Sequence, residues 1–224
     1  MKYKAIIFDM DGTIIDTEHI WKSATRKLVL SKGVTLTREL EEELSRQLHG
    51  LALIKSCQIL KDLTKIEDSV EALIEENSKL ACSMYSEGVV FIPGFLDFHK
   101  QLKDYNLKSG LATNADDNTL HITRNALKLE QFFGEHIYNI THVNNVYKPN
   151  PALYIHAAKQ LGLDPQDCIA IEDSAHGVKA AKAAGMYCIG INTAKNREFL
   201  KESDHIIDGY HEIDLNTLLI KNKN

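Results

Sequence analysis

Short apolar runs that end abruptly in polar residues constrain the fold of this chain most. The clear examples are AIIFD (5–9), SGLATN (109–114), CIAIED (168–173) and YCIGIN (187–192), and the weaker ones are HIYNI (136–140) and HIID (205–208). Continuous apolar runs of this length are typical of strands buried on both faces, as in a parallel sheet. Because helical patterns separate them, the sequence predicts an α/β fold with a Rossmann-like, doubly wound parallel sheet.

Residues 17–88 interrupt this alternation. They contain no convincing strand, and helical patterns rich in Glu, Lys and Leu occur around 17–32, 37–48, 51–63 and 67–87. So long an interruption is better explained by a second small domain than by a loop. We expect residues 1–16 and 89–224 to form the α/β core and residues 17–88 to form an inserted helical domain.

Composition and charge exclude several classes of protein. The chain has 224 residues and a formal net charge of -5, which gives no support for binding nucleic acid or an anionic membrane. Its four cysteines have no C-x-x-C spacing, and the apolar run at residues 5–8 is too short for a signal peptide. We expect a cytoplasmic, monomeric protein that has no nucleic-acid partner and does not enter a membrane.

Polar side chains that could carry chemistry stand where the predicted strands end. In an open α/β sheet, ligands bind at the carboxyl ends of the strands. A lysine also lies in the turn YKPNP, just before a predicted helix. The residues brought to this edge of the sheet are Asp9, Asp11, Thr113, Asn114, Lys148, Glu172 and Asp173.

Such a group of acids requires a cation. Two like charges 4 Å apart repel by about 4 kcal/mol at an effective dielectric constant of about 20. Asp9, Glu172 and Asp173 would therefore need protons or a metal, and an all-oxygen site suits Mg²⁺ and phosphate-bearing substrates. Lys148 adds positive charge, and Thr113-Asn114 offers hydrogen-bond donors. Together they indicate a phosphoryl-transfer site.

Each of these signals is weak when taken alone. A strand-end aspartate is usually a turn former, Glu172-Asp173 could cap the following helix, and a single Lys148 is more often on the surface. The segment D-M-D-G lacks the ligand spacing of an EF-hand, and the chain has no G-x-x-x-x-G-K-[ST] phosphate loop. The prediction depends on the order of the residues, each after a strand.

In that order the motifs resemble the haloacid dehalogenase superfamily, in its capped phosphatase and β-phosphoglucomutase-like branch. The motifs are Asp9-Met10-Asp11-Gly12-Thr13, Thr113-Asn114, Lys148-Pro149 and Glu172-Asp173-Ser174. The resemblance covers nearly the whole chain. It implies that residues 17–88 are a helical cap inserted after the first strand.

The resemblance also implies a two-step mechanism. Asp9 is expected to be the nucleophile that forms an aspartyl phosphate. Asp11 is expected to act as general acid for the leaving oxygen and then as general base for water. Two side chains at positions i and i+2 of extended backbone can share one side, so both could reach the same phosphate.

The remaining site residues are assigned by the same resemblance. The Asp9 carboxylate, the Asp11 backbone carbonyl and Asp173 are expected to hold Mg²⁺, with Glu172 acting through a metal-bound water. The residues expected to hold the phosphate are Thr113, Asn114 and Lys148.

The cap is expected to exclude water and to select the substrate. Hinges are expected at Asp16-Thr17 and near Gly88. The candidates for substrate selection are His19, Trp21, Lys22 and the turn His49-Gly50-Leu51. His19 and Lys22 are equally compatible with plain helix surface, and Trp21 with the core of the cap.

These features predict a Mg²⁺-dependent phosphatase that acts on a small phosphorylated metabolite, such as a sugar phosphate. One alternative is a β-phosphoglucomutase-like phosphomutase, although the arginine that such enzymes place shortly after the x-G-x turn is missing from residues 51–54. Another is a receiver-type phosphoacceptor module, but receivers are about half this length and lack both the cap and the second aspartate. Dehalogenation is disfavoured because it has no need of Asp11.

Overall fold

The structure, a computed structural model, describes residues 2–48 and 51–220. In this part of the chain, six parallel strands form one sheet in the order β5-β4-β1-β6-β7-β8. The strands are β1 (Ala5–Phe8), β4 (Lys108–Thr113), β5 (Ile137–Asn139), β6 (Cys168–Glu172), β7 (Tyr187–Ile191) and β8 (His205–Ile207). The chain moves outward from β1 to β5, returns to β6 beside β1, and moves outward again to β8. The predicted doubly wound α/β fold is confirmed.

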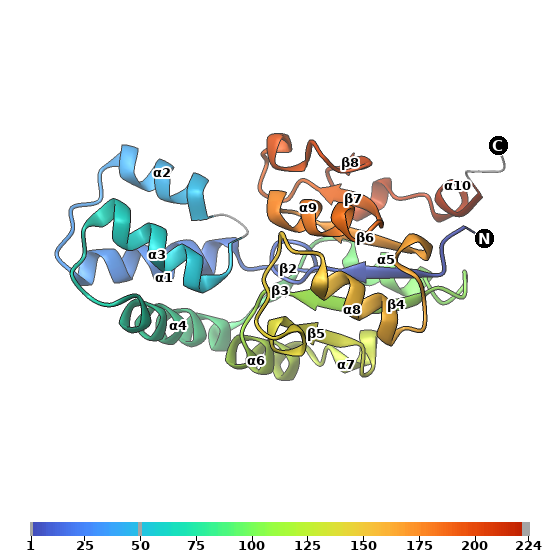
Figure 1. The fold of residues 1–224 in the computed structure, drawn as a ribbon, viewed down its shortest axis with the longest axis horizontal. Helices are drawn as coiled ribbons and strands as arrows, with labels where there is room; N and C mark the ends of the chain where they lie inside the picture. The colour runs from blue at the N-terminus through green and yellow to red at the C-terminus, as the bar shows by residue number, and fades with distance from the viewer. Residues whose placement is uncertain (1, 49–50, 221–224) are drawn as a thin grey trace.

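Helices cover both faces of this sheet (Figure 1). Their bounds are α5 (Phe95–Gln101), α6 (Asp117–Leu127), α7 (Glu130–Phe133), α8 (Ala152–Gln160), α9 (Ala175–Ala183) and α10 (Leu215–Ile220). Short 3-10 turns are η1 (Ile140–Val143), η2 (Pro165–Asp167), η3 (Arg197–Leu200) and η4 (Tyr210–Glu212). Successive β1 residues point to opposite faces, so Ile6 and Phe8 pack with α5 and α7, whereas Ala5 and Ile7 pack with α8 and α9. The sheet is thus buried on both sides.

Small residues bring α9 close to the carboxyl end of β6. Ala170 and Cys188 face α9 from the sheet, and Ala180 and Ala181 face them from the helix. At Gly177 a Cβ atom would lie only 1.9 Å from the Glu172 Cδ atom. A glycine is therefore required for the first turn of α9 to approach the end of the strand.

The segment between β1 and β4 forms a lobe of its own at the left of Figure 1. This helical lobe (residues 18–87) contains α1 (Glu18–Ser31), α2 (Arg38–Leu48), α3 (Leu53–Thr64) and α4 (Val70–Glu87). It has a separate hydrophobic cluster: Leu28, Val29, Leu44, Cys57, Leu60, Ile66 and Leu73. The four helical patterns in the sequence correspond to these helices.

A short ribbon joins the lobe to the sheet, and the sequence did not predict it. Strand β2 (Ile15–Asp16) pairs antiparallel with β3 (Val90–Phe91), where the chain leaves the core and where it returns. Each strand has two residues, which is too short for an alternating pattern to be recognised. The pairing holds the two connections side by side.

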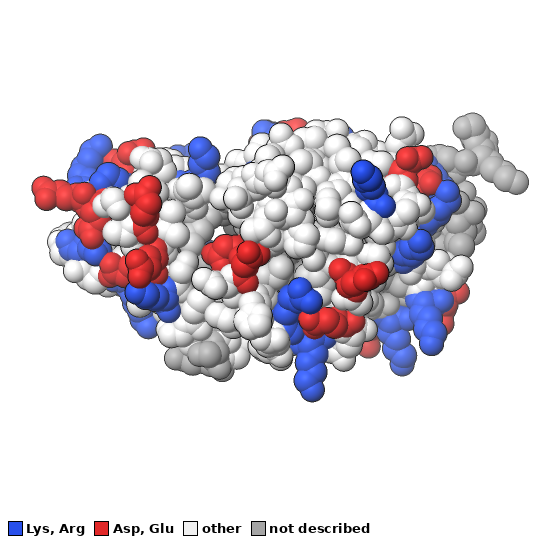
Figure 2. All heavy atoms as spheres, turned by 60° about the horizontal axis from the view of Figure 1, so that its bottom comes forward, with Lys and Arg blue, Asp and Glu red and all other residues white. Residues whose placement is uncertain are grey.

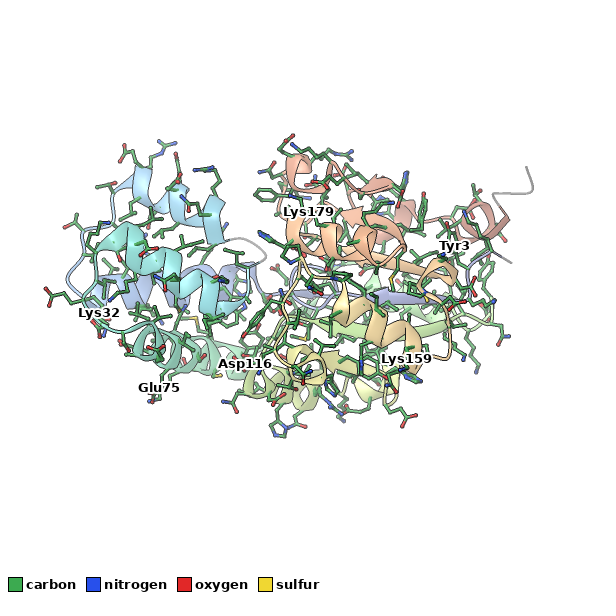
Figure 3. All side chains as sticks on the ribbon, viewed as in Figure 1. Tyr3, Lys32, Glu75, Asp116, Lys159 and Lys179 are labelled. Atoms are coloured by element: carbon green, nitrogen blue, oxygen red, sulfur yellow. The ribbon has the colours of Figure 1, made fainter. Side chains whose placement is uncertain are left out.

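The surface carries charges of both signs. In the view of Figure 2, Lys and Arg are interspersed with Asp and Glu over the helical lobe. Figure 3 shows Lys32 and Glu75 on the lobe away from the sheet, while Asp116 lies where the lobe meets the core. Among the described helices, none is both long and apolar enough to cross a membrane.

Candidate active site

Asp9 stands directly after β1, at the edge where the strand order reverses. Its backbone N–H still donates to the Ile171 carbonyl of β6 (3.0 Å), so the sheet determines where its side chain begins. The residue is 8% exposed, and its Oδ1 atom lies 2.6 Å from the Lys148 Nζ atom. The sheet thus presents a nearly buried carboxylate that is paired with a cation.

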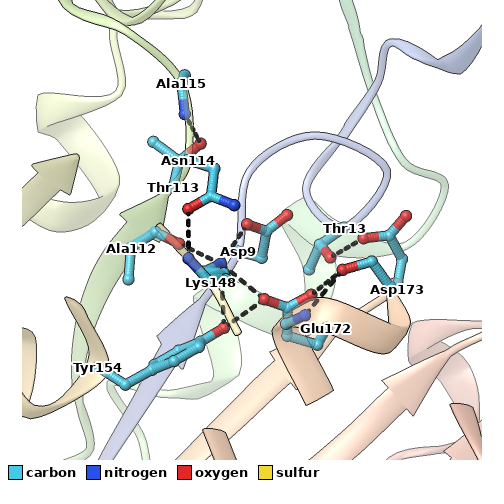
Figure 4. Close-up of polar contacts among 12 residues, drawn as sticks. Asp9, Thr13, Ala112, Thr113, Asn114, Ala115, Lys148, Tyr154, Glu172 and Asp173 are labelled. Carbon is cyan, nitrogen blue, oxygen red and sulfur yellow. Dashed lines mark hydrogen bonds and ion pairs between the residues drawn. The ribbon is translucent and has the colours of Figure 1, made fainter. Parts of the chain in front are cut away.

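Lys148 is held by three close oxygen acceptors and a fourth, the Tyr154 hydroxyl oxygen, at 3.4 Å. Its Nζ donates to Asp9 Oδ1 (2.6 Å), to Glu172 Oε1 (2.6 Å) and to the Ala112 carbonyl (2.8 Å), as Figure 4 shows. Tyr154 donates to the same Glu172 oxygen (2.7 Å), and its ring centroid lies 4.8 Å from Nζ. Burial lowers the pKa of Lys148, but the Asp9 and Glu172 carboxylates outweigh this and hold the pKa above its usual range. The ammonium group therefore stays charged.

The carboxylates of Asp9, Glu172 and Asp173, called here the acidic cluster, converge beyond Lys148. One oxygen of each lies within 4.8 Å of the others, and all three residues are buried. Burial raises the pKa of Asp9 to about 8, although Lys148 opposes the rise, and burial together with the Asp9 charge raises the pKa of Asp173 well above its usual range. One ammonium group does not offset three carboxylates, so the donor set fits a hard divalent cation.

Gly12 makes room for Asp173. Its φ of +77° is in the left-handed region, and a Cβ atom here would lie 2.2 Å from the Asp173 Oδ2 atom. The neighbouring Thr13 hydroxyl donates to Asp173 Oδ1 at 3.4 Å. Any side chain at position 12 would therefore displace the carboxylate, which accounts for glycine in the first motif.

The Asp11 side chain turns away from the acidic cluster towards the helical lobe. Its Oδ1 accepts hydrogen bonds from the Thr17 hydroxyl and from the Tyr85 hydroxyl on α4, both at 2.7 Å. Burial raises the pKa of Asp11, and hydrogen bonds from Thr17, Tyr85 and Trp21 oppose the rise. Asp9 and Asp11 nevertheless line the same cavity. Hydrogen bonds from the lobe thus oppose the rise in the pKa of Asp11, whereas Lys148 of the core opposes the rise in the pKa of Asp9.

Thr113 and Asn114 are oriented by backbone groups at the end of β4. Thr113 Oγ1 accepts the Ala115 N–H (3.0 Å), and Asn114 Oδ1 accepts the Lys148 N–H (3.0 Å). These contacts use oxygen lone pairs, so the hydroxyl proton and the amide N–H groups are not consumed by them. The pair can therefore donate to an anion in the cavity.

The structure brings the predicted site residues to one edge of the sheet. Six of them line the cavity: Asp9, Asp11, Thr113, Asn114, Lys148 and Asp173. Glu172 lies beside Lys148 and does not line the cavity. Tyr154 and Tyr85 were not predicted. Tyr154 lies on α8, six residues after Lys148, so a local pattern could have linked the two. Tyr85 lies 74 residues from Asp11, and no local pattern links them.

The cavity has a volume of about 690 Å³ and extends from the strand ends into the helical lobe. Trp21, Lys22 and Leu51, which the sequence offered as candidates for substrate selection, line it. His19 does not line it, and its ring lies 3.6 Å from the Asp16 carboxylate on the exposed surface. The other two residues of the predicted turn, His49 and Gly50, are outside the described residues.

Comparison with known proteins finds one family. The family described as haloacid dehalogenase-like hydrolases matches residues 6–191. A phosphorylated carbohydrates phosphatase of Thermotoga maritima is 30% identical over 183 residues, which cover 82% of each chain. A β-phosphoglucomutase of Bacillus subtilis is 28% identical over 193 residues, covering 84% of this chain and 83% of the relative.

A solved structure has the same fold. The β-phosphoglucomutase of Clostridium difficile superimposes with a TM-score of 0.81 and 25% sequence identity. The match covers 97% of this chain and 96% of that protein. It therefore includes the helical lobe as well as the sheet.

Proposed function

This chain belongs to the haloacid dehalogenase-like hydrolases, and from that premise we propose that it is a Mg²⁺-dependent phosphatase of a small-metabolite phosphomonoester, such as a sugar phosphate. The observation that carries the proposal is the convergence of Asp9, Lys148 and the acidic cluster on a cavity that Asp11 also lines. The relative from Thermotoga maritima is named as a phosphatase of phosphorylated carbohydrates and the one from Bacillus subtilis as a β-phosphoglucomutase, which supports this substrate class. Membership of an enzyme family removes the receiver-type alternative.

Asp9 is the proposed nucleophile. Its Oδ atom forms a bond to phosphorus while the bond from phosphorus to the leaving oxygen breaks, and Asp11 gives that oxygen a proton. Asp11 then takes a proton from water, whose oxygen attacks phosphorus and releases Asp9 and inorganic phosphate. A raised pKa suits Asp11 to this exchange because it favours the protonated form that the first step needs.

Lys148, Thr113 and Asn114 are the proposed phosphate-binding groups. Lys148 Nζ is 2.6 Å from Asp9, so a phosphoryl group attached to Asp9 would lie beside an ammonium group. Glu172 and Tyr154 would act as positioning residues, because their contacts with Lys148 keep Nζ at this place.

The acidic cluster fits Mg²⁺ by its chemistry. Its donors are all carboxylate oxygens, they are buried, and their charge exceeds that of Lys148. Asp9, Asp173 and the backbone carbonyl of Asp11 are the proposed ligands. When bound, the ion would neutralise negative charge on the phosphoryl oxygens. Glu172 Oε1 is occupied by Lys148 and Tyr154, so any contact through water would use Oε2.

The helical lobe is the proposed cap, with residues 17–88 as a domain on the core of residues 1–16 and 89–224. The hydrogen bond from Tyr85 attaches Asp11 to the lobe, and the one from Thr17 comes from the proposed hinge. Movement of the lobe about Asp16-Thr17 and Gly88 would therefore move the Tyr85 hydroxyl, which donates to Asp11, together with the walls of the cavity. Such closure would exclude water before the proton transfer.

A phosphomutase is the second candidate, because the similarity to β-phosphoglucomutases extends over the whole fold. Against it, the residues that follow the predicted turn His49-Gly50-Leu51 are Ala52, Leu53 and Ile54, and none of them is a cation. An assay of β-glucose 1-phosphate isomerisation with a bisphosphate primer should detect no product. Isomerisation faster than phosphate release would replace the phosphatase proposal.

A phosphate-release screen over metabolite phosphates with Mg²⁺ tests the proposal. Asp9→Asn should lower the rate on the best substrate at least a thousand-fold, since it removes the nucleophile and keeps the size of the side chain. The matched control is Asp97→Asn, which alters an exposed acid on α5 and should leave the rate unchanged. Equal rates for wild type and Asp9→Asn would contradict the mechanism.

A further inference from the structure

Asn77 is buried in the wall of the cavity with an unsatisfied amide oxygen. The residue lies on α4 and is 2% exposed, and its Oδ1 atom has no hydrogen-bond partner. Among the described residues, the other buried side-chain atoms without a partner are His176 Nδ1 and Asn192 Oδ1. Neither of those residues lines the large cavity, whereas Asn77 does.

The nitrogen of the same amide is anchored between helices. It donates to the Thr25 hydroxyl on α1 at 3.5 Å. Burial raises the pKa of the Cys57 thiol on α3 to about 11, and a hydrogen bond from Asn77 opposes the rise. Because the contact with Thr25 uses an N–H group and Oδ1 has no partner, the oxygen is the end of the amide that can accept a hydrogen bond from a ligand.

The wall of the cavity within the helical lobe combines apolar residues with polar and charged ones, which include Lys22, Arg26, Glu41 and Glu42. The nonpolar residues that line the cavity within the helical lobe are Trp21, Leu36, Leu44, Leu48, Leu51, Ala52, Leu53, Ile54 and Ile74. An unsatisfied buried acceptor lowers the stability of the fold by about 1–3 kcal/mol, and such groups are therefore rare in native proteins. A donor on a molecule in the cavity would satisfy Oδ1 and would be recognised at that point.

We propose that Asn77, oriented by Thr25, is a specificity-determining residue that binds a hydroxyl group of the leaving group. This inference rests on the proposed phosphatase function. It makes the substrate a phosphomonoester of an alcohol with an apolar body and a second hydroxyl remote from the phosphate. A neutral amide oxygen beside a threonine hydroxyl suits a neutral donor, whereas an ammonium group would require a carboxylate partner.

Matched probes that differ by one hydroxyl group test the proposal. Straight-chain alkyl phosphates of three to eight carbons are compared with ω-hydroxyalkyl phosphates of the same length. In the wild type, kcat/KM should favour the hydroxyl compound at least about tenfold at one chain length, because a site built for a donor rejects the analogue that lacks it. Asn77→Leu should reduce this ratio to one or below.

Glu71→Gln is the matched control. It alters an exposed residue of α4 that does not line the cavity, so it should keep the wild-type ratio. Asn77→Leu should unfold in urea at the same or a higher concentration than the wild type, because it removes an unsatisfied acceptor. If Asn77→Leu does not fold, Thr25→Val tests the same pair and should also lower the ratio.

Binding without catalysis separates this inference from the proposed function. The chain has one tryptophan, Trp21, which lines the cavity, so its fluorescence reports binding of the free alcohols. A 1,n-alkanediol should bind more tightly than the n-alkanol of the same length, and Asn77→Leu should remove the difference. The inference is overturned if Asn77→Leu preserves either preference, if the wild type shows neither, or if ω-aminoalkyl phosphates are preferred. Phosphate release that does not depend on Asp9 would instead overturn the phosphatase proposal.

Discussion

The carboxyl edge of the sheet and the helical lobe both carry ion pairs, but in opposite environments. In the pair between Lys148 and Glu172 the side chains are 2% and 0% exposed. In the lobe, Arg38 and Glu42 form a pair one helical turn apart, and their side chains are 87% and 66% exposed. Water screens the second pair, whereas the first depends on its own partners for solvation.

This difference shows what each region contributes to the site. The sheet concentrates charge that only a matched counter-charge can stabilise. The lobe contributes uncharged donors, such as Tyr85 to Asp11, and apolar residues in the walls of the cavity. Many of its charges lie on the outer surface, where they affect solubility more than stability, and Lys22, Arg26, Glu41 and Glu42 also line the cavity.

Removing the buried cation should have the largest effect. Lys148→Met leaves Asp9 and Glu172 buried without their partner, which typically destabilises a protein by about 3–5 kcal/mol. The measurement is urea unfolding at pH 7, with Lys79→Met in the lobe as the control, because Lys79 is 73% exposed. If the two variants lose equal stability, the contrast between the regions is wrong.

Adding Mg²⁺ should stabilise the sheet edge next most strongly. Burial raises the pKa of Asp9 and Asp173, so without metal the folded state binds more protons than the unfolded one and loses stability as the pH rises from about 4 to about 8. A cation favours the ionised forms, so its effect should be larger at pH 8 than at pH 6. At a hundred times the Kd it should add about 2.7 kcal/mol.

Two variants separate specific binding of Mg²⁺ from a general salt effect. Asp173→Asn should abolish most of the stabilisation, and Asp97→Asn should retain it. The proposed site would be contradicted if Mg²⁺ stabilised the wild type and both variants equally, or if its stabilisation of the wild type declined with rising pH.

A half-buried histidine should produce a smaller effect, and the stability that it contributes should change with pH in the opposite direction. His99 packs against Phe8, Phe95, Phe132 and Phe133, and burial lowers its pKa to about 4. The unfolded chain therefore gains a proton before the folded one, and stability is lost as the pH falls from about 6.5 towards 4.

His99→Phe keeps the aromatic packing and removes the titration. The wild type should lose about 1 kcal/mol more than this variant between pH 7 and pH 5, a value reduced from the full shift because the ring is partly exposed. The difference between the unfolding free energies at the two pH values measures it. Parallel losses in both proteins would show that His99 does not contribute.

The exposed pair in the lobe should have the smallest effect. Arg38→Ala, Glu42→Ala and the double variant form a cycle that isolates the interaction. Its contribution should shift the urea midpoint by less than about 0.3 M, because an exposed pair in adjacent helical turns contributes little. A coupling energy between Arg38 and Glu42 as large as the stability lost in Lys148→Met would remove the distinction between exposed and buried pairs.

Much of the fold could be predicted because its signals are local. Apolar runs such as residues 5–9 and 168–173 indicate strands and end where the polar site residues begin, and the helical patterns of residues 17–87 match α1 to α4. The ribbon of β2 and β3 could not be predicted, because two-residue strands have no periodicity of their own. Tyr85 was missed for a related reason, since its partner Asp11 is distant in the sequence.

The sequence by itself determined the order of the strands along the chain, the inserted helices and the residue types at each strand end. These follow from hydrophobic periodicity and motif spacing, which are properties of neighbouring residues. Only the tertiary structure decided which acids share a cation, that the Asp11 side chain turns towards the lobe, and that Asn77 has an unsatisfied oxygen beside the cavity. Burial, desolvation and unsatisfied hydrogen bonds depend on which distant segments pack together, and no local pattern records that packing.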